Sequence, residues 1–289
     1  MPRFAQLVIG PAGCGKSSYC SLMQKHCHTI HHECKVVNLD PAAEYFDYEP
    51  DVDIRELIEL DDVMMDDELK LGPNGGLVYC LEHLVQNLDW LDKEMGEDEC
   101  DYFLFDCPGQ IELYSHLPIM PKLVEYFQRK WDFRFVSVYI LDARFLVDSS
   151  HLLAGMLSAM SAMLVLGTGH VNIMSKMDLL SEKQRKLVNA RFLEPDTRYL
   201  VDLDHATPGH SQNFRRLTQS LADLLDQYSM IQFFPVNPDD EETIQAVLIQ
   251  IDFCLQYDEN VESHQRLYDQ AEMGLSSINE LEERLGFDG

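Results

Sequence analysis

Residues Gly10–Ser18 form the sequence GPAGCGKSS, directly after the apolar run Phe4–Ile9. In the pattern G-x-x-x-x-G-K-[ST], glycines let backbone N–H groups close on phosphate oxygens, and the lysine, here Lys16, reaches the outer phosphates. The Ser17 hydroxyl is a Mg²⁺ ligand, and the helix that begins there directs its positive end at the anion. We therefore assign phosphate and metal contacts to Gly13, Cys14, Gly15, Lys16, Ser17 and Ser18.

A second motif, FLFDCPGQIE at Phe103–Glu112, places an aspartate at the end of a predicted strand. An aspartate at the carboxyl end of a strand beside a phosphate loop binds Mg²⁺ directly or through water, which makes Asp106 the second metal candidate. Gly109 can present its backbone N–H to a γ-phosphate, and Gln110 can orient an attacking water. The order Asp-x-x-Gly-Gln is typical of GTP hydrolases, whereas an adenylate or nucleoside kinase has no use for it.

The third motif is NIMSKMDLL, in which Lys176 and Asp178 follow another predicted strand. In the guanine-specific pattern [NT]-K-x-D, the carboxylate accepts hydrogen bonds from guanine N1–H and N2–H, while the lysine stem covers the ring. Ser175 stands where asparagine or threonine is usual, and its hydroxyl keeps the departure mild. The motif predicts binding of GTP and GDP in preference to adenine nucleotides.

The elements that must position these motifs alternate between strands and helices. Apolar, β-branched runs indicate strands, and apolar residues at three- and four-residue spacing indicate helices. The predicted strands are Phe4–Ile9, Lys35–Asn38, Tyr102–Phe105, Phe133–Leu141, Val171–Ser175 and Ile231–Pro235, and the predicted helices are Ser17–His28, Leu77–Leu91, Leu146–Leu166, Phe214–Tyr228 and Gln245–Tyr257. This order predicts an α/β fold, with a mostly parallel P-loop sheet and helices on both faces.

The charge of the chain bears on its partners. The 289 residues carry a formal net charge of −28. Such a surface repels nucleic-acid phosphate and anionic membranes, so we expect no direct contact with either. The charge then serves solubility or attracts a basic protein partner. Because residues 258–289 are strongly acidic, we predict a single GTPase domain over 1–257 and an acidic C-terminal tail over 258–289.

The cysteines and the apolar segments bear on location. The eight cysteines form no C-x-x-C pair, and Cys14 and Cys107 lie beside the phosphate motifs. Those positions suit reduced thiols and favour a cytoplasmic or nuclear compartment. The first residues lack the design of a signal peptide, and the apolar stretch Leu152–Leu166 is shorter than the ~20 residues of a membrane span.

One stretch, His26–Cys34, is rich in histidine and cysteine. Its spacing is usable for zinc, which needs four converging ligands. The stretch follows the predicted first helix, away from the nucleotide motifs. We therefore favour a surface loop over a metal site.

The sequence LGPNGG at Leu71–Gly76 predicts only a turn by itself. Together with VVNLDPAAEYFDY at Val36–Tyr48, DIRELI at Asp53–Ile58 and DCPGQIELY at Asp106–Tyr114, it resembles the GPN-loop GTPases from residue 1 to about 257. The start of the chain and the segment DIRELIELDDVM are most similar to the third eukaryotic paralogue group. The resemblance implies a Ras-like GTPase core with a GPN-loop insertion formed by Gly72, Pro73 and Asn74.

The same resemblance implies partners and a role. In that family, dimers form across the nucleotide sites and the GPN loop reaches the partner's γ-phosphate region, which makes Asn74 a candidate catalytic residue. By analogy, Asp40 is a switch residue near Mg²⁺ and the attacking water, and Glu112 is a second candidate for organising that water. The implied partners are a paralogous GPN-loop GTPase, with a homodimer as the alternative, and subunits of RNA polymerase II. The implied role is assembly and nuclear import of that polymerase by a cytoplasmic protein that shuttles to the nucleus.

Three functions compete on the sequence alone. The leading hypothesis is a GTP-hydrolysing assembly factor that acts like a chaperone. The alternative is a catalytically weak scaffold within a heterodimer, whose nucleotide is mainly structural. A P-loop kinase is the third, but the arginines of this chain are scattered rather than gathered in a lid, and Gln110, Lys176 and Asp178 favour the GTPase.

Overall fold

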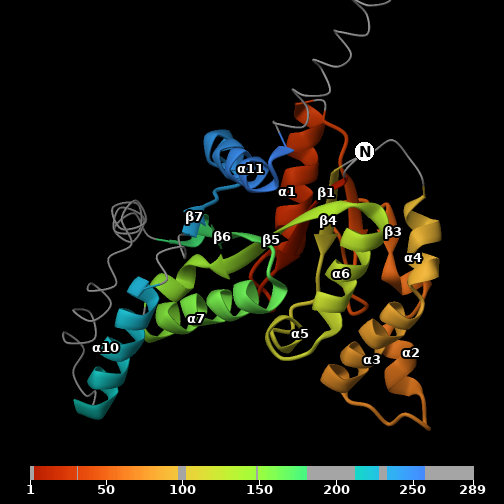
Figure 1. The fold of residues 1–289 in the computed structure, drawn as a ribbon, viewed down its shortest axis with the longest axis horizontal. Helices are drawn as coiled ribbons and strands as arrows, with labels where there is room; N and C mark the ends of the chain where they lie inside the picture. Colours follow the sequence, from red (N-terminus) through yellow and green to blue (C-terminus); the bar gives the residue numbers. More distant parts are fainter. Residues whose placement is uncertain are drawn as a thin grey trace, which may run out of the picture.

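The computed structural model describes residues 3–30, 32–96, 102–147, 149–180, 212–227 and 233–257. Within them, a seven-stranded sheet has the order β3-β2-β4-β1-β5-β6-β7, and all neighbouring strands are parallel. The strands are β1 (Arg3–Ile9), β2 (Lys35–Asn38), β3 (Val52–Asp53), β4 (Tyr102–Asp106), β5 (Phe133–Asp142), β6 (Gly169–Ser175) and β7 (Phe233–Pro235). The predicted α/β fold is confirmed. Its parallel strands all end at the same edge of the sheet (Figure 1).

Helices cover both faces of the sheet, and each face has its own core. On one face, apolar residues of β1, β4 and β5 pack with α1 (Lys16–Thr29) and α11 (Glu241–Leu255). The other face is covered by α3 (Pro73–Gln86), α4 (Leu88–Met95), α5 (Glu112–Ser115), α6 (Ile119–Trp131), α7 (Ser149–Leu166) and α10 (Gln212–Gln227). The remaining described helices are α2 (Leu60–Met65), η1 (Ile54–Glu56), η2 (Ala143–Val147) and η3 (Met177–Leu179).

The prediction of one helix over Leu77–Leu91 is wrong at both ends. Helix α3 begins at Pro73 and ends at Gln86, and α4 begins at Leu88. Proline is preorganised for the first helical position, where its missing N–H costs nothing. Asn87 interrupts the helical path, and its side-chain amide donates to the His83 carbonyl at 2.8 Å.

The turn predicted for LGPNGG is therefore wrong as well. Gly72 precedes the helix, and Pro73 and Asn74 form its first turn, closed by a hydrogen bond from Gly76 N to Gly72 O at 2.8 Å. Gly76 is buried against α2, where an added Cβ would lie 2.8 Å from Leu60 Cδ1. In Figure 1, α2 and α3 lie together beyond the edge of the sheet.

Three helices have no counterpart in the prediction, namely α2, α5 and α6. The sequence of α6 carries an apolar stripe at helical spacing, formed by Ile119, Met120, Leu123, Val124 and Phe127, all buried. That periodicity is a readable signal. The short α2 and α5 offer no comparable stripe, because four to six residues are too few to repeat one.

The surface-loop prediction for His26–Cys34 is wrong for three of its residues. His26 and Cys27 are buried in the last turns of α1, and Cys34 is buried just before β2. A hydrogen bond from Cys34, together with His32, lowers the pKa of the Cys27 thiol to about 5. Among the residues that the structure describes, no cluster of three or more His, Cys, Asp and Glu could hold a metal ion.

The tail 258–289 lies outside the described residues, and so does Cys100. The predicted domain boundary at residue 257 stays a prediction. In the described part of the chain, no helix is both long and apolar enough to span a membrane. Helix α7, which holds the apolar stretch Leu152–Leu166, packs into the core through Leu153, Met156 and Ala159.

Candidate functional site

The sheet order brings three of the sequence motifs to one place. Strand β1 lies between β4 and β5, and its register sets Val8 opposite Asp106. The next pair, β5 with β6, sets Asp142 opposite Ser175. Because all these strands run in the same direction, the P-loop, the Asp106 motif and the Lys176 motif leave the sheet side by side.

The P-loop joins β1 to α1 in the geometry that anion binding needs. Gly15 precedes the helix in a left-handed conformation with φ of 96°, which favours glycine. Lys16 is the first helical residue, is 7% exposed, and donates from Nζ to the Pro11 carbonyl at 3.3 Å. Burial raises the pKa of the Cys14 thiol to about 11, against the charges of Lys16 and Lys176. Cys14 is therefore a neutral, unreactive part of the loop near pH 7.

Asp106 ends β4 in an enclosed position beside this loop. Burial raises its pKa, against the lowering effects of the Ser17 and Tyr48 hydroxyls and of the Lys16 charge. Its Oδ2 accepts a hydrogen bond from Tyr48 Oη at 2.8 Å. Its Oδ1 is buried and has no hydrogen-bond partner within the described residues. A carboxylate oxygen that is buried and unpaired suits a hydrated Mg²⁺, which prefers one or two carboxylates together with waters and phosphates.

The turn after β4 presses against the P-loop. A Cβ added to Gly109 would lie 2.6 Å from Ala12 Cα, so only glycine allows this approach of the two backbones. Gln110 follows, and its side-chain Oε1 is buried without a hydrogen-bond partner in the part of the chain described. A buried acceptor of this kind is costly unless a ligand or water completes it. The predicted residues Asp106, Gly109 and Gln110 are thus brought together with the P-loop.

The third motif also contacts the P-loop. Ser175 Oγ donates to the Cys14 carbonyl at 2.5 Å, and Lys176 Nζ donates to the Gly13 carbonyl. Lys176 also pairs with Asp142, 3.2 Å away. Asp178 lies two residues beyond, exposed on η3. The serine at the unusual position therefore ties the Lys176 segment to the phosphate loop.

Asp40 and Glu112, the two residues proposed by analogy to organise the attacking water, differ in their exposure. Asp40 follows β2, half-buried, and burial raises its pKa while the Lys16 charge and the Ala42 N–H oppose the rise. Its charge also acts on Asp106, which places both acids near Lys16. Glu112 is exposed at the start of α5. The GPN residues are likewise exposed, with Gly72 just before α3 and Pro73 and Asn74 in its first turn.

Two Asp-x-Arg ion pairs, which lie at the ends of strands, were not identified from the sequence. Asp53 ends β3 and Asp142 ends β5, and each accepts bonds from the backbone N–H and the guanidinium of the arginine two residues later. Burial alone raises the pKa of Asp142, but Arg144 and Lys176 lower it to about 2. The signal available in the sequence was an aspartate at the end of a strand, which is the same signal that identified Asp106.

Comparison with known proteins shows the family to which the chain belongs. A family model described as a conserved hypothetical ATP-binding protein matches residues 8–257. GPN-loop GTPase 3 of Xenopus tropicalis is 52% identical over 91% of this chain and 91% of its own length. The protein of the same name from Saccharomyces cerevisiae is 44% identical, over 91% of this chain and 96% of its own length. The chain belongs to the GPN-loop GTPase family.

A solved structure shows the fold of this GPN-loop GTPase as well. The apo form of a GTPase from Pyrococcus abyssi superposes with a TM-score of 0.71 and covers 86% of this chain and 96% of its own. Its sequence is 23% identical, so the likeness concerns the fold. The predicted P-loop sheet with helices on both faces is confirmed by this neighbour.

We expect Gly109→Ala to weaken nucleotide binding by about tenfold, because the added methyl forces the turn away from Ala12, and such overpacking costs roughly 1–3 kcal/mol. The measurement is a titration with a fluorescent guanine nucleotide. Gly169→Ala is the matched control, since its methyl has its nearest neighbour at 3.7 Å. Unchanged affinity in Gly109→Ala would show that the contact of the two loops does not shape the site.

Proposed function

We propose that this GPN-loop GTPase binds GTP with Mg²⁺ at the carboxyl ends of β1, β4 and β6, and hydrolyses it with Gln110 orienting the attacking water. The observation that carries the proposal is a pair of buried acceptors, Asp106 Oδ1 and Gln110 Oε1, which have no partner in the described chain. Both belong to the segment that Gly109 presses against the P-loop. The two acceptors are therefore positioned for a hydrated ion and a water beside bound phosphates.

Phosphate binding falls to the P-loop. The N–H groups of Gly13, Gly15 and the first residues of α1 are proposed to donate to phosphate oxygens, as helix N-termini do. The Cys14 N–H, which donates to the Pro11 carbonyl at 3.3 Å in this structure, is proposed to join them when the anion binds. Lys16 supplies a positive charge to this loop, and in this structure its ammonium donates a hydrogen bond to the Pro11 carbonyl. We propose that the β- and γ-phosphates displace that contact. Ser18 continues the first turn of α1.

The oxygens of Ser17 and Asp106 fit Mg²⁺, which neutralises charge on the β- and γ-phosphates when it is bound. The other residues around the metal position act by holding the reacting groups in place. Gly109 presents its backbone toward the phosphate loop, and Gln110 Oε1 accepts a hydrogen bond from the water and so orients it. Asp40, which is near enough to Lys16 for that charge to lower its pKa, is a second water-organising candidate. Glu112 and Asn74 keep their proposed catalytic roles, although both are exposed in the monomer.

Replacing Gln110 with leucine removes the acceptor and keeps the size of the side chain. We expect GTP hydrolysis under single-turnover conditions to fall by about tenfold or more, with GTP affinity little changed, because orientation of the water acts mainly in the transition state. Gln245→Leu, on the exposed side of α11, is the matched control. Hydrolysis at the unmodified rate would transfer the role to Asp40 or Glu112. Negligible turnover by the unmodified protein, alone and with a paralogue, would favour the nucleotide-bound scaffold.

Guanine selectivity is proposed to come from Asp178, with the Lys176 stem covering the ring. Lys176 is held over the P-loop by its bonds to Gly13 and Asp142, which leaves its stem beside the nucleotide position. Asp178 follows on η3.

We expect Asp178→Ala to lower the preference for GDP over ADP by about 100-fold, because the guanine donors lose their charged partner. Competition binding with both nucleotides measures the ratio. Asp89→Ala, at an exposed position of α4 outside the motif segments, controls for lost charge. Equal competition by ADP in the unmodified protein would refute guanine selectivity altogether.

The GPN turn suggests how the site is completed. Asn74 sits on the first turn of α3, where Pro73 and the contact with α2 hold it at low entropic cost. On the same pair of packed helices, Met65 of α2 is 80% exposed and Tyr79 of α3 is exposed too. We propose that a paralogous GPN-loop GTPase, or a second copy of this chain, covers this face and receives Asn74 near its γ-phosphate.

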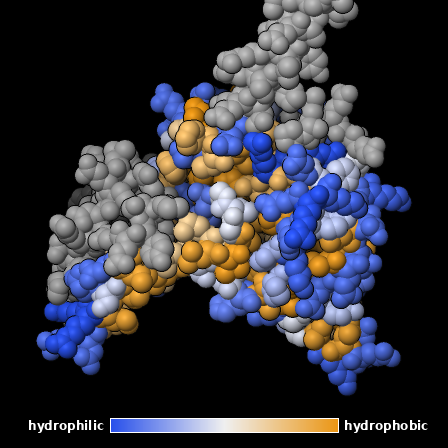
Figure 2. All heavy atoms as spheres, viewed as in Figure 1, coloured by the Kyte–Doolittle hydropathy of each residue, from blue (hydrophilic) through white to orange (hydrophobic). Residues whose placement is uncertain are grey.

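The client is proposed to be RNA polymerase II, which the protein accompanies from cytoplasmic assembly to nuclear import. This part of the proposal rests on the motif resemblance. The structure adds an apolar surface where α7 meets α10, with Leu164 at 61% and Leu217 at 54% exposure (Figure 2). Polymerase subunits are expected to bind differently to the GTP-analogue and GDP states.

We expect Met65→Asp to prevent dimer formation with the paralogue in the presence of a GTP analogue, since a charge on an apolar contact is poorly tolerated. Light scattering measures the mass, and purified polymerase subunits are then added to each state. Ile249→Asp, on the exposed face of α11, is the control. A monomer under every condition would contradict the dimer, and identical subunit binding in both nucleotide states would contradict a gated client role.

A further inference from the structure

Tyr48 reaches from the loop between β2 and β3 into the candidate metal site. Its hydroxyl donates to Asp106 Oδ2 at 2.8 Å, and both side chains are buried, at 6% and 2% exposure. None of the motifs on which the proposed function rests assigns a role to Tyr48. A buried tyrosine hydroxyl needs a partner, and here the partner is a carboxylate assigned to Mg²⁺.

The bond decides how the Asp106 carboxylate is presented. A carboxylate accepts through both oxygens, and a donor on one of them sets the plane of the group. With Oδ2 held by Tyr48, Oδ1 remains buried and without a partner in the described structure. Metal-ligating groups depend on such supporting hydrogen bonds, whose loss typically lowers metal affinity by about 10- to 100-fold.

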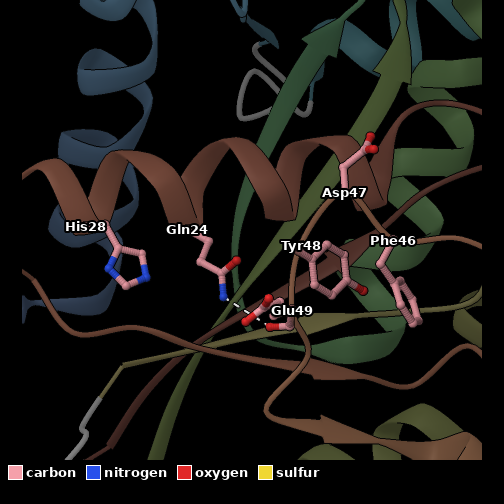
Figure 3. A pocket seen from close by; sticks show the side chains of 6 residues that line it. All are labelled: Gln24, His28, Phe46, Asp47, Tyr48 and Glu49. Carbon is pink, nitrogen blue, oxygen red and sulfur yellow. Dashed lines mark hydrogen bonds between the residues drawn. The ribbon is translucent and has the colours of Figure 1, made fainter.

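Tyr48 is itself held from both sides. Ser21 Oγ of α1 donates to the Asp47 carbonyl at 2.8 Å, and Gln24 Nε2 donates to the Glu49 carbonyl at 3.2 Å. Figure 3 shows Gln24 and His28 pointing from α1 toward this segment, with the Gln24 bond as a dashed line. Gln24, His28 and Phe46–Glu49 line an open groove of about 370 Å³.

The aromatic neighbour adds a further support. The Phe46 and Tyr48 rings lie 4.9 Å apart between centroids, and the Arg55 guanidinium covers Phe46 at 4.5 Å. Arg55 is fixed in turn by its ion pair with Asp53 at the end of β3. The segment Phe46–Glu49 thus connects α1 and β3 to Asp106 through one hydroxyl.

We propose that Tyr48 is a positioning residue for the metal site, acting through Asp106 to hold the carboxylate for Mg²⁺. This inference rests on the proposed function, because it takes Asp106 as the metal residue. It also makes the segment Phe46–Glu49 part of the nucleotide-responsive machinery. When the bond to Asp106 is lost, the segment keeps its contacts with α1 but no longer supports the ion.

The test compares Tyr48→Phe with Tyr45→Phe, a matched control in the same loop whose side chain is 88% exposed. Dissociation of a fluorescent GDP is followed over a range of Mg²⁺ concentrations and in excess EDTA. We expect Tyr48→Phe to raise the Mg²⁺ concentration for half-maximal retention by about tenfold, while its dissociation rate in EDTA matches the unmodified protein. Tyr45→Phe is expected to change neither quantity.

Three results would overturn the proposal. An unchanged Mg²⁺ requirement would reduce the bond to a satisfied core contact, and a lower requirement would show that Tyr48 blocks the site. In Asp106→Asn, addition of Tyr48→Phe is expected to have no further effect, since Tyr48 acts through that carboxylate. A tenfold further effect in that background would also contradict the proposal.

A second variant keeps the test valid if Tyr48→Phe does not fold. Ser21→Ala loosens the segment on α1 without touching Asp106, and we expect it to raise the Mg²⁺ requirement by about threefold. No shift in this variant would count against the coupling. Failure of the proposed function gives a different signature, because the unmodified protein would then retain GDP equally with Mg²⁺ and with EDTA.

Discussion

Parallel pairing of β1 with β4 on one side and with β5 on the other determines where the segments of the candidate site lie. Parallel strands end at the same edge, so the P-loop after β1 meets the Asp106 turn after β4 without any long-range adjustment of the loops. The contact is close enough that Gly109 has no room for a side chain beside Ala12. The same pairing through β6 brings Ser175 onto the backbone of the P-loop. The segments proposed to bind phosphate, metal and base are thereby joined by strand register.

The pKa of each aspartate at this edge of the sheet shifts in a direction that depends on the groups bonded to it. Asp142 and Asp53 each receive an arginine two residues ahead, which favours their ionised forms and lowers their pKa values. Within the described residues, no cation is bonded to Asp106, so burial prevails and its pKa rises. The two aspartates paired with arginine stabilise the structure, whereas Asp106, which keeps one oxygen without a partner in the described residues, is the one that suits a ligand. The distinction depends on which partner each acid meets, and all of them stand at the end of a strand in the sequence.

The segment between β2 and β3 shows how a loop without a strong motif becomes part of the site. Its backbone is held on α1 by Ser21 and Gln24, and Tyr48 is directed inward to Asp106. Nothing in the spacing of a tyrosine from an aspartate 58 residues away predicts that bond. The contact arises because β2 pairs directly with β4, so the segment after β2 starts beside the end of β4, and the bonds from α1 then hold it there.

The sequence by itself determined the P-loop, the Asp106 turn, the Lys176 segment and the α/β class, because each depends on local backbone requirements and on periodicity. Strand β2 was predicted with its observed bounds, and α6 carried a readable apolar stripe that the prediction passed over. Only the tertiary structure decided that Pro73 begins a helix, that Cys27 and Cys34 are buried together, and that Tyr48 reaches Asp106. These outcomes depend on which distant segment fills each space. Local propensities differ by about 1 kcal/mol or less for most residues, so packing against such a neighbour outweighs them.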